Sequence, residues 1–136
     1  MNVLQKSKKN QRRIGLTGGI ASGKTTITNY IRKHKNIPIL DADYFSRELI
    51  KPNTYGYKKI LDYFGNKIID NKSNSEKEIN RKLLRNIIFK HSASKEWIEK
   101  LLHPLIKERM IEECSQYKNN QTIVLAIPLL LSLIHI

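Results

Sequence analysis

Residues Gly15–Thr26, GLTGGIASGKTT, combine glycines, a lysine and hydroxyl side chains in a spacing that can hold phosphate groups. The segment Gly18–Thr25 meets the Walker A pattern, Gly-x-x-x-x-Gly-Lys-Thr. The glycines let backbone N–H groups approach phosphate oxygens, Lys24 can neutralise the β- and γ-phosphates, and the Thr25 hydroxyl can ligate Mg²⁺. The stretch therefore predicts binding of a nucleoside triphosphate. The alternative is a glycine-rich turn without a ligand.

Two carboxylates follow in the segment ILDADYFSREL and could carry out proton transfer. One of Asp41 and Asp43 could accept the proton of an acceptor hydroxyl, and the other could orient Mg²⁺ through water. Arg47 lies four residues after Asp43, on the same face of a helix, and could hold an acceptor phosphate. Asp43 taken alone could instead be a helix N-cap. The sequence does not decide which aspartate takes the proton.

The elements expected around these residues alternate between short apolar strands and helices. The segment RRIGLTG predicts a buried strand ending near Leu16 or Thr17, residues 24–34 predict an amphipathic helix, and IPIL, ending in Asp41, predicts a second strand. This order is typical of a parallel sheet with crossover helices, whose strands end at the edge that binds ligands. We therefore predict an α/β fold with a parallel sheet.

Helices are expected to dominate the next part of the chain. They are predicted over residues 42–50, 55–65 and 79–88, and around Ile98, with a break at Pro104 and a resumption toward Met110. The polar residues 70–78 predict a surface connection, and QTIVLAIPLL predicts a third buried strand. Tyr63 and Trp97 lie among apolar residues at helical spacing, which favours the core over a base-stacking role.

The charge of the chain favours anionic partners. There are 25 Lys and Arg residues against 12 Asp and Glu, a net charge of +13, and residues 1–40 contain no acidic side chain. The alternative to an anion-binding surface is a lysine-rich solvated one. A nucleic-acid-binding module is not favoured, because no aromatic residues interleave with the basic clusters.

The cysteine content and the lack of a recognisable signal peptide favour a cytoplasmic location. The single cysteine, Cys114, permits no intrachain disulfide, and this fits a reducing compartment. Residues 1–12 read as a disordered basic leader without the apolar stretch of a signal peptide. Residues 123–136 are apolar but too short to span a membrane.

Four segments together resemble a known family: IGLTGGIASGKTT, ILDADYFSREL, LLHPLIKE and IVLAIPLL, in this order and spacing. They are similar to the dephospho-CoA kinases, and the resemblance covers Arg13 to Leu130. It implies a three-layer P-loop NTPase fold and a cytoplasmic, monomeric enzyme. That enzyme would use Mg²⁺ and transfer the γ-phosphate of ATP to the ribose 3′-hydroxyl of dephospho-CoA, the last step of coenzyme A biosynthesis. Neither nucleic acid nor membrane is implied as a partner. Other small-molecule P-loop kinases, of the nucleoside, nucleotide or shikimate type, share the first segment and are the alternative.

On the ATP side, the resemblance implies a catalytic role for Lys24 and a metal-ligand role for Thr25. The residues expected to bind ATP are Gly18, Gly19, Ala21, Ser22, Gly23, Lys24, Thr25 and Thr26. Family members often carry serine after the lysine. The hydroxyl is kept here, so Mg²⁺ ligation is expected to survive.

On the acceptor side, the resemblance makes Asp43 the base or orienter of the 3′-hydroxyl, with Asp41 beside it. Arg47 and His103 are expected to contact the substrate. His103 falls in a His-Pro motif of the helical region that borders the acceptor pocket. The alternative is that His103 only ends a helix before Pro104.

The end of the chain departs from the family. Ala126 stands in the last strand where an acid would complete a Walker B element, and family members continue through an arginine-bearing lid. The segment LSLIHI, Leu131–Ile136, matches the translation of an adaptor used in transposase-based sequencing libraries. We therefore expect residues 13–130 to be a kinase domain incomplete at its C-terminus, with a helical acceptor-binding region at about 51–118. Such a fragment is expected to be poorly soluble and poorly active.

Overall fold

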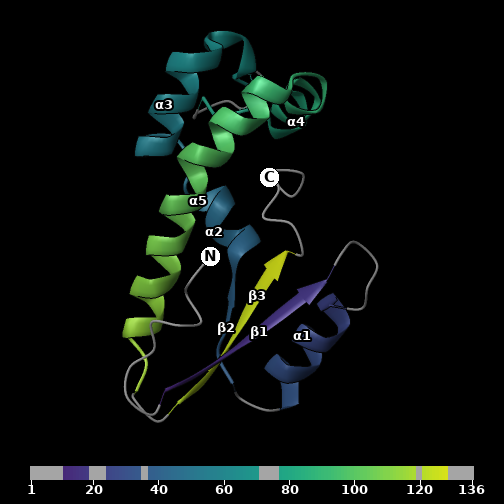
Figure 1. Ribbon diagram of the computed structural model, residues 1–136, viewed down its shortest axis with the longest axis vertical. Helices are drawn as coiled ribbons and strands as arrows, with labels where there is room; N and C mark the ends of the chain where they lie inside the picture. The colour runs from purple at the N-terminus through teal and green to yellow at the C-terminus, as the bar shows by residue number, and fades with distance from the viewer. Residues whose placement is uncertain (1–10, 19–23, 35–36, 71–76, 119–120, 129–136) are drawn as a thin grey trace. The chain divides into compact units, whose positions relative to one another are not determined.

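A computed structural model of the chain describes residues 11–18, 24–34, 37–70, 77–118 and 121–128. For Thr17, Gly18, Lys24, Thr25, His34 and Pro128 the backbone alone is described. The chain divides into two compact units: Met1–Phe45 with Ile106–Leu131, and Ser46–Leu105 with Ser132–Ile136. The predicted basic leader and the predicted adaptor-derived tail both lie outside the described residues. Figure 1 labels the elements.

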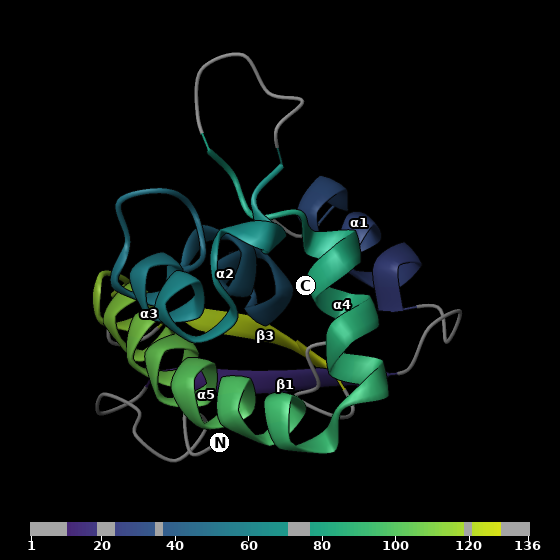
Figure 2. The same cartoon turned by 90° about the horizontal axis from the view of Figure 1, so that it is seen from above.

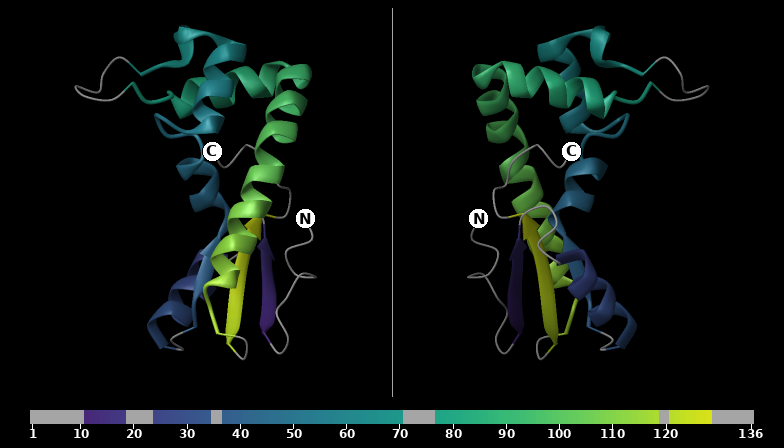
Figure 3. Two further views of the ribbon diagram at one scale, coloured as in Figure 1. Left: turned by 90° about the vertical axis from the view of Figure 1, so that its left-hand side faces the viewer. Right: turned by 90° about the vertical axis from the view of Figure 1, so that its right-hand side faces the viewer.

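The first unit contains a parallel three-stranded sheet. Its strands are β1 (Arg12–Gly18), β3 (Thr122–Pro128) and β2 (Ile39–Asp41), in the order β1-β3-β2. They lie side by side in two directions of view (Figures 1 and 3). In the central strand, Val124 pairs with Ile14 of β1 and with Ile39 of β2. Residues 123–126 of this strand are buried, as expected for aliphatic residues in a strand covered on both faces.

Helix α1 (Lys24–His34) follows β1 and packs against it before the chain enters β2 (Figure 2). A crossover of this kind is what two parallel strands of one sheet require. The helix predicted over residues 24–34 is confirmed, as are the second and third strands. Strand β1 runs to Gly18, slightly further than the predicted end near Leu16 or Thr17.

Gln11 ties the start of β1 to the end of helix α5 (Ser92–Ser115). Its buried amide nitrogen donates to the carbonyls of Cys114 at 3.1 Å and Lys118 at 3.4 Å, and its Oε1 accepts from Arg13 Nε at 2.9 Å. Carbonyls at a helix end lack intrahelical donors, so this side chain caps α5. Burial raises the pKa of the Cys114 thiol, although the charge of Arg13 opposes the effect. The cysteine is therefore a neutral, buried thiol.

Helices dominate the second unit. Helix α2 (Ala42–Glu48) enters it and is followed by α3 (Tyr55–Phe64), the short 3₁₀ helix η1 (Asn66–Ile68) and α4 (Arg81–Lys90). Thr54 caps α3 by accepting from Tyr57 N–H at 3.2 Å, and Asn80 caps α4 by accepting from Leu83 N–H at 3.1 Å. The core side chains of this unit are Ile50, Ile60, Phe64, Ile68, Ile79, Leu84, Ile88, Ile98 and Leu102.

Two sequence-based predictions in this region are wrong. Ile79 does not begin a helix, because it pairs with Ile69 in an antiparallel bridge and α4 starts at Arg81. Helix α5 is not broken at Pro104 but runs continuously from Ser92 to Ser115. Five side chains at four-residue intervals on α5 are each at most 3% exposed. They are Ile98, Leu102, Ile106, Met110 and Cys114. Burial of this continuous stripe outweighs the hydrogen bond that a proline removes from a helix.

Tyr63 and Trp97 pack against each other, but not deep in the core as predicted. Their rings are stacked, with centroids 4.0 Å apart and planes 15° apart. Tyr63 is 45% exposed, and Trp97 is half-buried. The neighbouring Phe64 meets Trp97 edge to face and is buried.

Among the described residues, no helix is both long and apolar enough to cross a membrane.

Candidate active site

The Walker A segment has the backbone context that its function requires. Strand β1 ends at Gly18, the first residue of the pattern, and helix α1 begins at Lys24, its lysine. A helix that starts at this lysine directs its first N–H groups toward the preceding loop, where they attract anions. Thr26 is exposed in the first turn of α1. The predicted ATP-binding residues Gly19, Ala21, Ser22 and Gly23 lie outside the described residues.

The sheet brings the start of this segment and the aspartates to one edge. Because β1, β3 and β2 are parallel, they all end at the same side of the sheet, and Asp41 is the last residue of β2. Asp41 pairs with Ala126, which pairs with Leu16, while Gly18 lies two residues further along β1. With neighbouring strands about 4.8 Å apart and a rise of about 3.3 Å per residue, the backbone of Asp41 lies roughly 12 Å from that of Gly18. This spacing leaves room for a phosphate group and an acceptor hydroxyl.

Asp41 and Asp43 occupy different positions at the start of α2. Asp41 Oδ1 accepts a hydrogen bond from the Asp43 N–H at 2.9 Å, so Asp41 is the N-cap of the helix. Asp43 lies in the first turn, half-buried, with its Oδ1 atom buried. The alternative in which Asp43 caps the helix is therefore wrong. The buried Ala42 and Phe45 anchor this turn.

The central strand adds no acid to this edge. Ala126, at the level of Asp41, is 2% exposed, and strand β3 ends without a carboxylate at Pro128. Among the described side chains, Asp41 and Asp43 supply carboxylate oxygens at this edge, and the backbone of Thr25 lies in the first turn of α1. Carboxylate oxygens are ligands that suit Mg²⁺. Within the described part of the chain, no group of three or more His, Cys, Asp or Glu side chains is placed to hold a metal ion.

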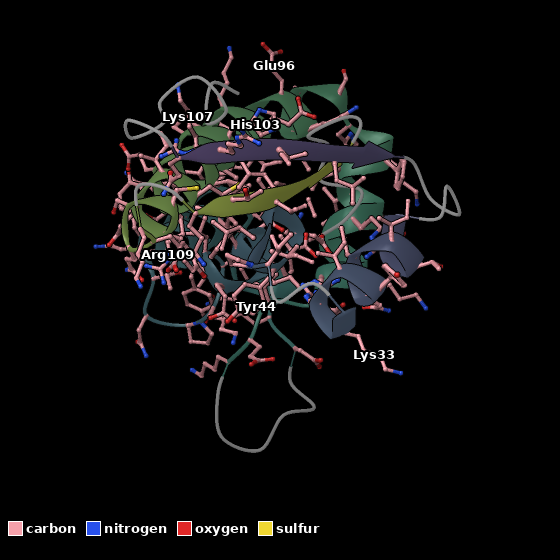
Figure 4. All side chains as sticks on the ribbon, turned by 90° about the horizontal axis from the view of Figure 1, so that it is seen from below. Lys33, Tyr44, Glu96, His103, Lys107 and Arg109 are labelled. Carbon is pink, nitrogen blue, oxygen red and sulfur yellow. The ribbon has the colours of Figure 1, made fainter. Side chains whose placement is uncertain are left out.

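The two other predicted acceptor residues belong to the second unit. Arg47 is exposed in the last turn of α2. His103 lies half-buried on α5, from which its side chain projects (Figure 4). Since α5 continues to Ser115, the alternative in which His103 ends a helix is wrong.

Tyr44 is a candidate site residue that the sequence analysis did not consider. It follows Asp43 in the first turn of α2 and is 56% exposed, with its ring edge to face against Phe45 at 5.5 Å (Figure 4). An exposed aromatic ring beside two carboxylates can stack on a nucleotide base. The sequence feature that could have pointed to Tyr44 is an aromatic residue within one helical turn of the paired aspartates.

Comparisons with known proteins agree on one family. A sequence model described as dephospho-CoA kinase matches residues 12–133. The dephospho-CoA kinase of Prochlorococcus marinus strain MIT 9312 is 87% identical over 130 residues, which make up 96% of this chain and 63% of that protein. The dephospho-CoA kinase of Vibrio vulnificus strain CMCP6 is 44% identical over 86% of this chain and 55% of its own. The chain thus spans less than two thirds of the length of these curated relatives.

Solved structures share the fold. A crystal structure of a Thermus thermophilus protein superposes with a TM-score of 0.72 at 25% identity, over 93% of this chain and 59% of that one. A dephospho-CoA kinase from Campylobacter jejuni superposes with a TM-score of 0.65 at 26% identity, over 87% of this chain and 57% of that one.

Proposed function

The chain belongs to the dephospho-CoA kinase family, and on this premise we propose that it transfers the γ-phosphate of ATP to the ribose 3′-hydroxyl of dephospho-CoA, which gives coenzyme A. The observation that carries the proposal is the shared edge of the sheet. The strand that leads into the Walker A segment and the strand that leads into Asp41 and Asp43 end there together. Phosphoryl transfer needs a phosphate cradle and a group that orients the acceptor hydroxyl at one site.

Asp43 is the residue that we assign as the base. It takes the proton of the 3′-hydroxyl as that oxygen bonds to the γ-phosphorus. The bond from this phosphorus to the β–γ bridging oxygen breaks, and ADP leaves. This assignment is supported by the capping role of Asp41, which already engages one of its carboxylate oxygens with the backbone. Arg47 and His103 are assigned to the acceptor.

The ATP side rests on the Walker A residues. Glycine N–H groups and Lys24 neutralise the β- and γ-phosphates, and the residues so assigned are Gly18 to Thr26. Thr25 would hold Mg²⁺, with Asp41 orienting it through water, and the ion when bound would neutralise charge on the phosphates. We further propose that the protein acts as a cytoplasmic monomer, with ATP and dephospho-CoA as its partners and without nucleic acid or membrane.

An acceptor panel tests this proposal. The protein is expressed from its source gene as far as the stop codon, which is first established by sequencing across codons 125–140 with primers outside any library adaptor. ADP formation is then measured with dephospho-CoA, nucleosides, nucleotides and shikimate as acceptors. We expect dephospho-CoA to be preferred and Lys24→Ala to abolish turnover. Preference for another acceptor would identify a different P-loop kinase.

A further inference from the structure

Helix α5 is shared by the two compact units of the chain (Figure 1). Residues of the helix up to Leu105 belong to the second unit, and those from Ile106 onward belong to the first. Among the described residues, the only other passage between the units lies in α2, between Phe45 and Ser46. Any turn of one unit against the other therefore has to be taken up at these two helices.

Pro104 lies next to the passage in α5 and weakens the helix at that level. Proline has no N–H group, so the Lys100 carbonyl lacks its helical donor, and the proline ring crowds that carbonyl. Pro104 and Lys100 are both exposed, so water can bond to the freed carbonyl. Sharp bends in helices occur at prolines for these reasons. Bending α5 at this level thus costs less free energy than bending it elsewhere.

Each half of α5 is anchored by buried side chains. Ile98 and Leu102, on the N-terminal side of the proline, are residues of the second unit and are 0% exposed. Met110 and Cys114, on its C-terminal side, are residues of the first unit and are also 0% exposed. The helix is thus held firmly on both sides of Pro104, and the weakened turn lies between the two anchors.

We propose that Pro104 makes α5 a hinge, at which the second unit turns relative to the first during each catalytic cycle. The link to the catalytic cycle rests on the proposed function, whereas the bend itself does not. Hinge residues absorb a change of backbone angles between anchored segments, and Pro104 occupies such a position. A hinge also gives a reason for a residue that costs stability inside a helix whose buried stripe is otherwise continuous.

Distances between spin labels on the two units test this inference, in the protein expressed to the stop codon of its gene. One label is attached at Lys33→Cys in the first unit and the other at Lys82→Cys in the second, both exposed positions. The background is freed of native cysteines such as Cys114. A second pair, Lys58→Cys with Lys82→Cys, lies within the second unit and serves as the control. Double electron–electron resonance measures the distribution of distances for each pair.

We expect a broad distribution of distances between the units that Pro104→Ala narrows, because alanine restores the hydrogen bond to the Lys100 carbonyl and stiffens the helix. Pro52→Ala, in a turn within the second unit, is the matched control and should leave both distributions unchanged. We also expect Pro104→Ala to lower kcat several-fold with a smaller effect on KM, since a stiffer hinge slows opening and product release.

The outcomes separate this inference from the proposed function. Equal distributions between the units in the wild type and in Pro104→Ala, or an unchanged kcat in Pro104→Ala, would overturn the hinge. Narrowing in the pair within the second unit would show that Pro104 loosens that unit alone, which would also overturn it. If no coenzyme A is formed although Pro104→Ala still narrows the distribution between the units, the proposed function fails and the bend in α5 stands. Circular dichroism of each variant checks that the protein is folded.

Discussion

At the scale of single residues, the two aspartates of the candidate site predict different effects of the same substitution. Asp43→Asn removes the proposed base, so we expect turnover to fall about 10²–10⁴-fold without a loss of stability. Asp41→Asn keeps a good N-cap, and we expect its unfolding free energy to stay near that of the wild type. Asp41→Ala removes the cap and should cost about 1 kcal/mol. Steady-state kinetics and urea unfolding measure these effects. Full activity of Asp43→Asn, with an inactive Asp41→Asn, would reverse the assignment.

Two glycines are required for different reasons, one for space and one for backbone conformation. A Cβ on Gly56 would overlap the Leu49 carbonyl oxygen, so alanine should destabilise by about 1–3 kcal/mol. Gly65 has open space around it, but its φ of 82° and ψ of 179° lie in a region that essentially only glycine adopts. There alanine and asparagine should both cost about 1–3 kcal/mol. Urea unfolding of Gly56→Ala, Gly65→Ala and Gly65→Asn checks this. A Gly65→Asn variant as stable as the wild type would contradict the backbone explanation.

The residue scale also marks a limit of the sequence analysis. The phosphate segment, both aspartates and Arg47 were predicted from residue types and spacing, and His103 was predicted from the family resemblance. The division of roles between Asp41 and Asp43 was not, because it depends on whether α2 starts at residue 42 or two residues later. Periodicity does not fix a helix start that closely.

At the scale of elements, we expect alanine in place of each of two prolines to change the stability of the protein in opposite directions. Pro104 lies inside α5, where it leaves the Lys100 carbonyl without its helical donor. We expect Pro104→Ala to stabilise the protein by about 2 kcal/mol. Pro52 precedes Asn53, whose φ is 70°, in a turn closed by the Thr54 N–H donating to the Lys51 carbonyl at 3.2 Å.

Proline at the second position of such a turn limits the unfolded chain, so Pro52→Ala should destabilise by about 0.4–1 kcal/mol. Thermal and urea unfolding of both variants test the contrast. If Pro104→Ala were less stable than the wild type, the expected gain from restoring the helical hydrogen bond would be contradicted.

The same scale explains which elements the sequence predicts. Helix α1 and strands β2 and β3 were predicted because their apolar residues repeat locally. Continuity of α5 was missed because it depends on the summed burial of side chains from Ile98 to Cys114, which outweighs one local break.

At the scale of the whole molecule, the sheet of the first unit predicts self-association. Within the described residues, β1 pairs only with β3, and Ile14 on β1 is 51% exposed. An apolar edge strand can pair with another chain, and a lysine at the edge blocks this. We expect the 136-residue chain to aggregate at high concentration and Ile14→Lys to raise its soluble fraction. Light scattering after size exclusion measures both. Equal aggregation of the two proteins would show that self-association does not depend on Ile14 of strand β1.

The central claim is that this protein phosphorylates dephospho-CoA, and identification of the product tests it most directly. The protein, expressed to the stop codon of its gene, is incubated with ATP, Mg²⁺ and dephospho-CoA, and the product is examined by mass spectrometry and phosphorus NMR. We predict coenzyme A with a new monoester on the ribose 3′-oxygen, one ADP for each product, and no product with Lys24→Ala. ATP consumed without such a product, or a phosphate on another atom, would contradict the claim.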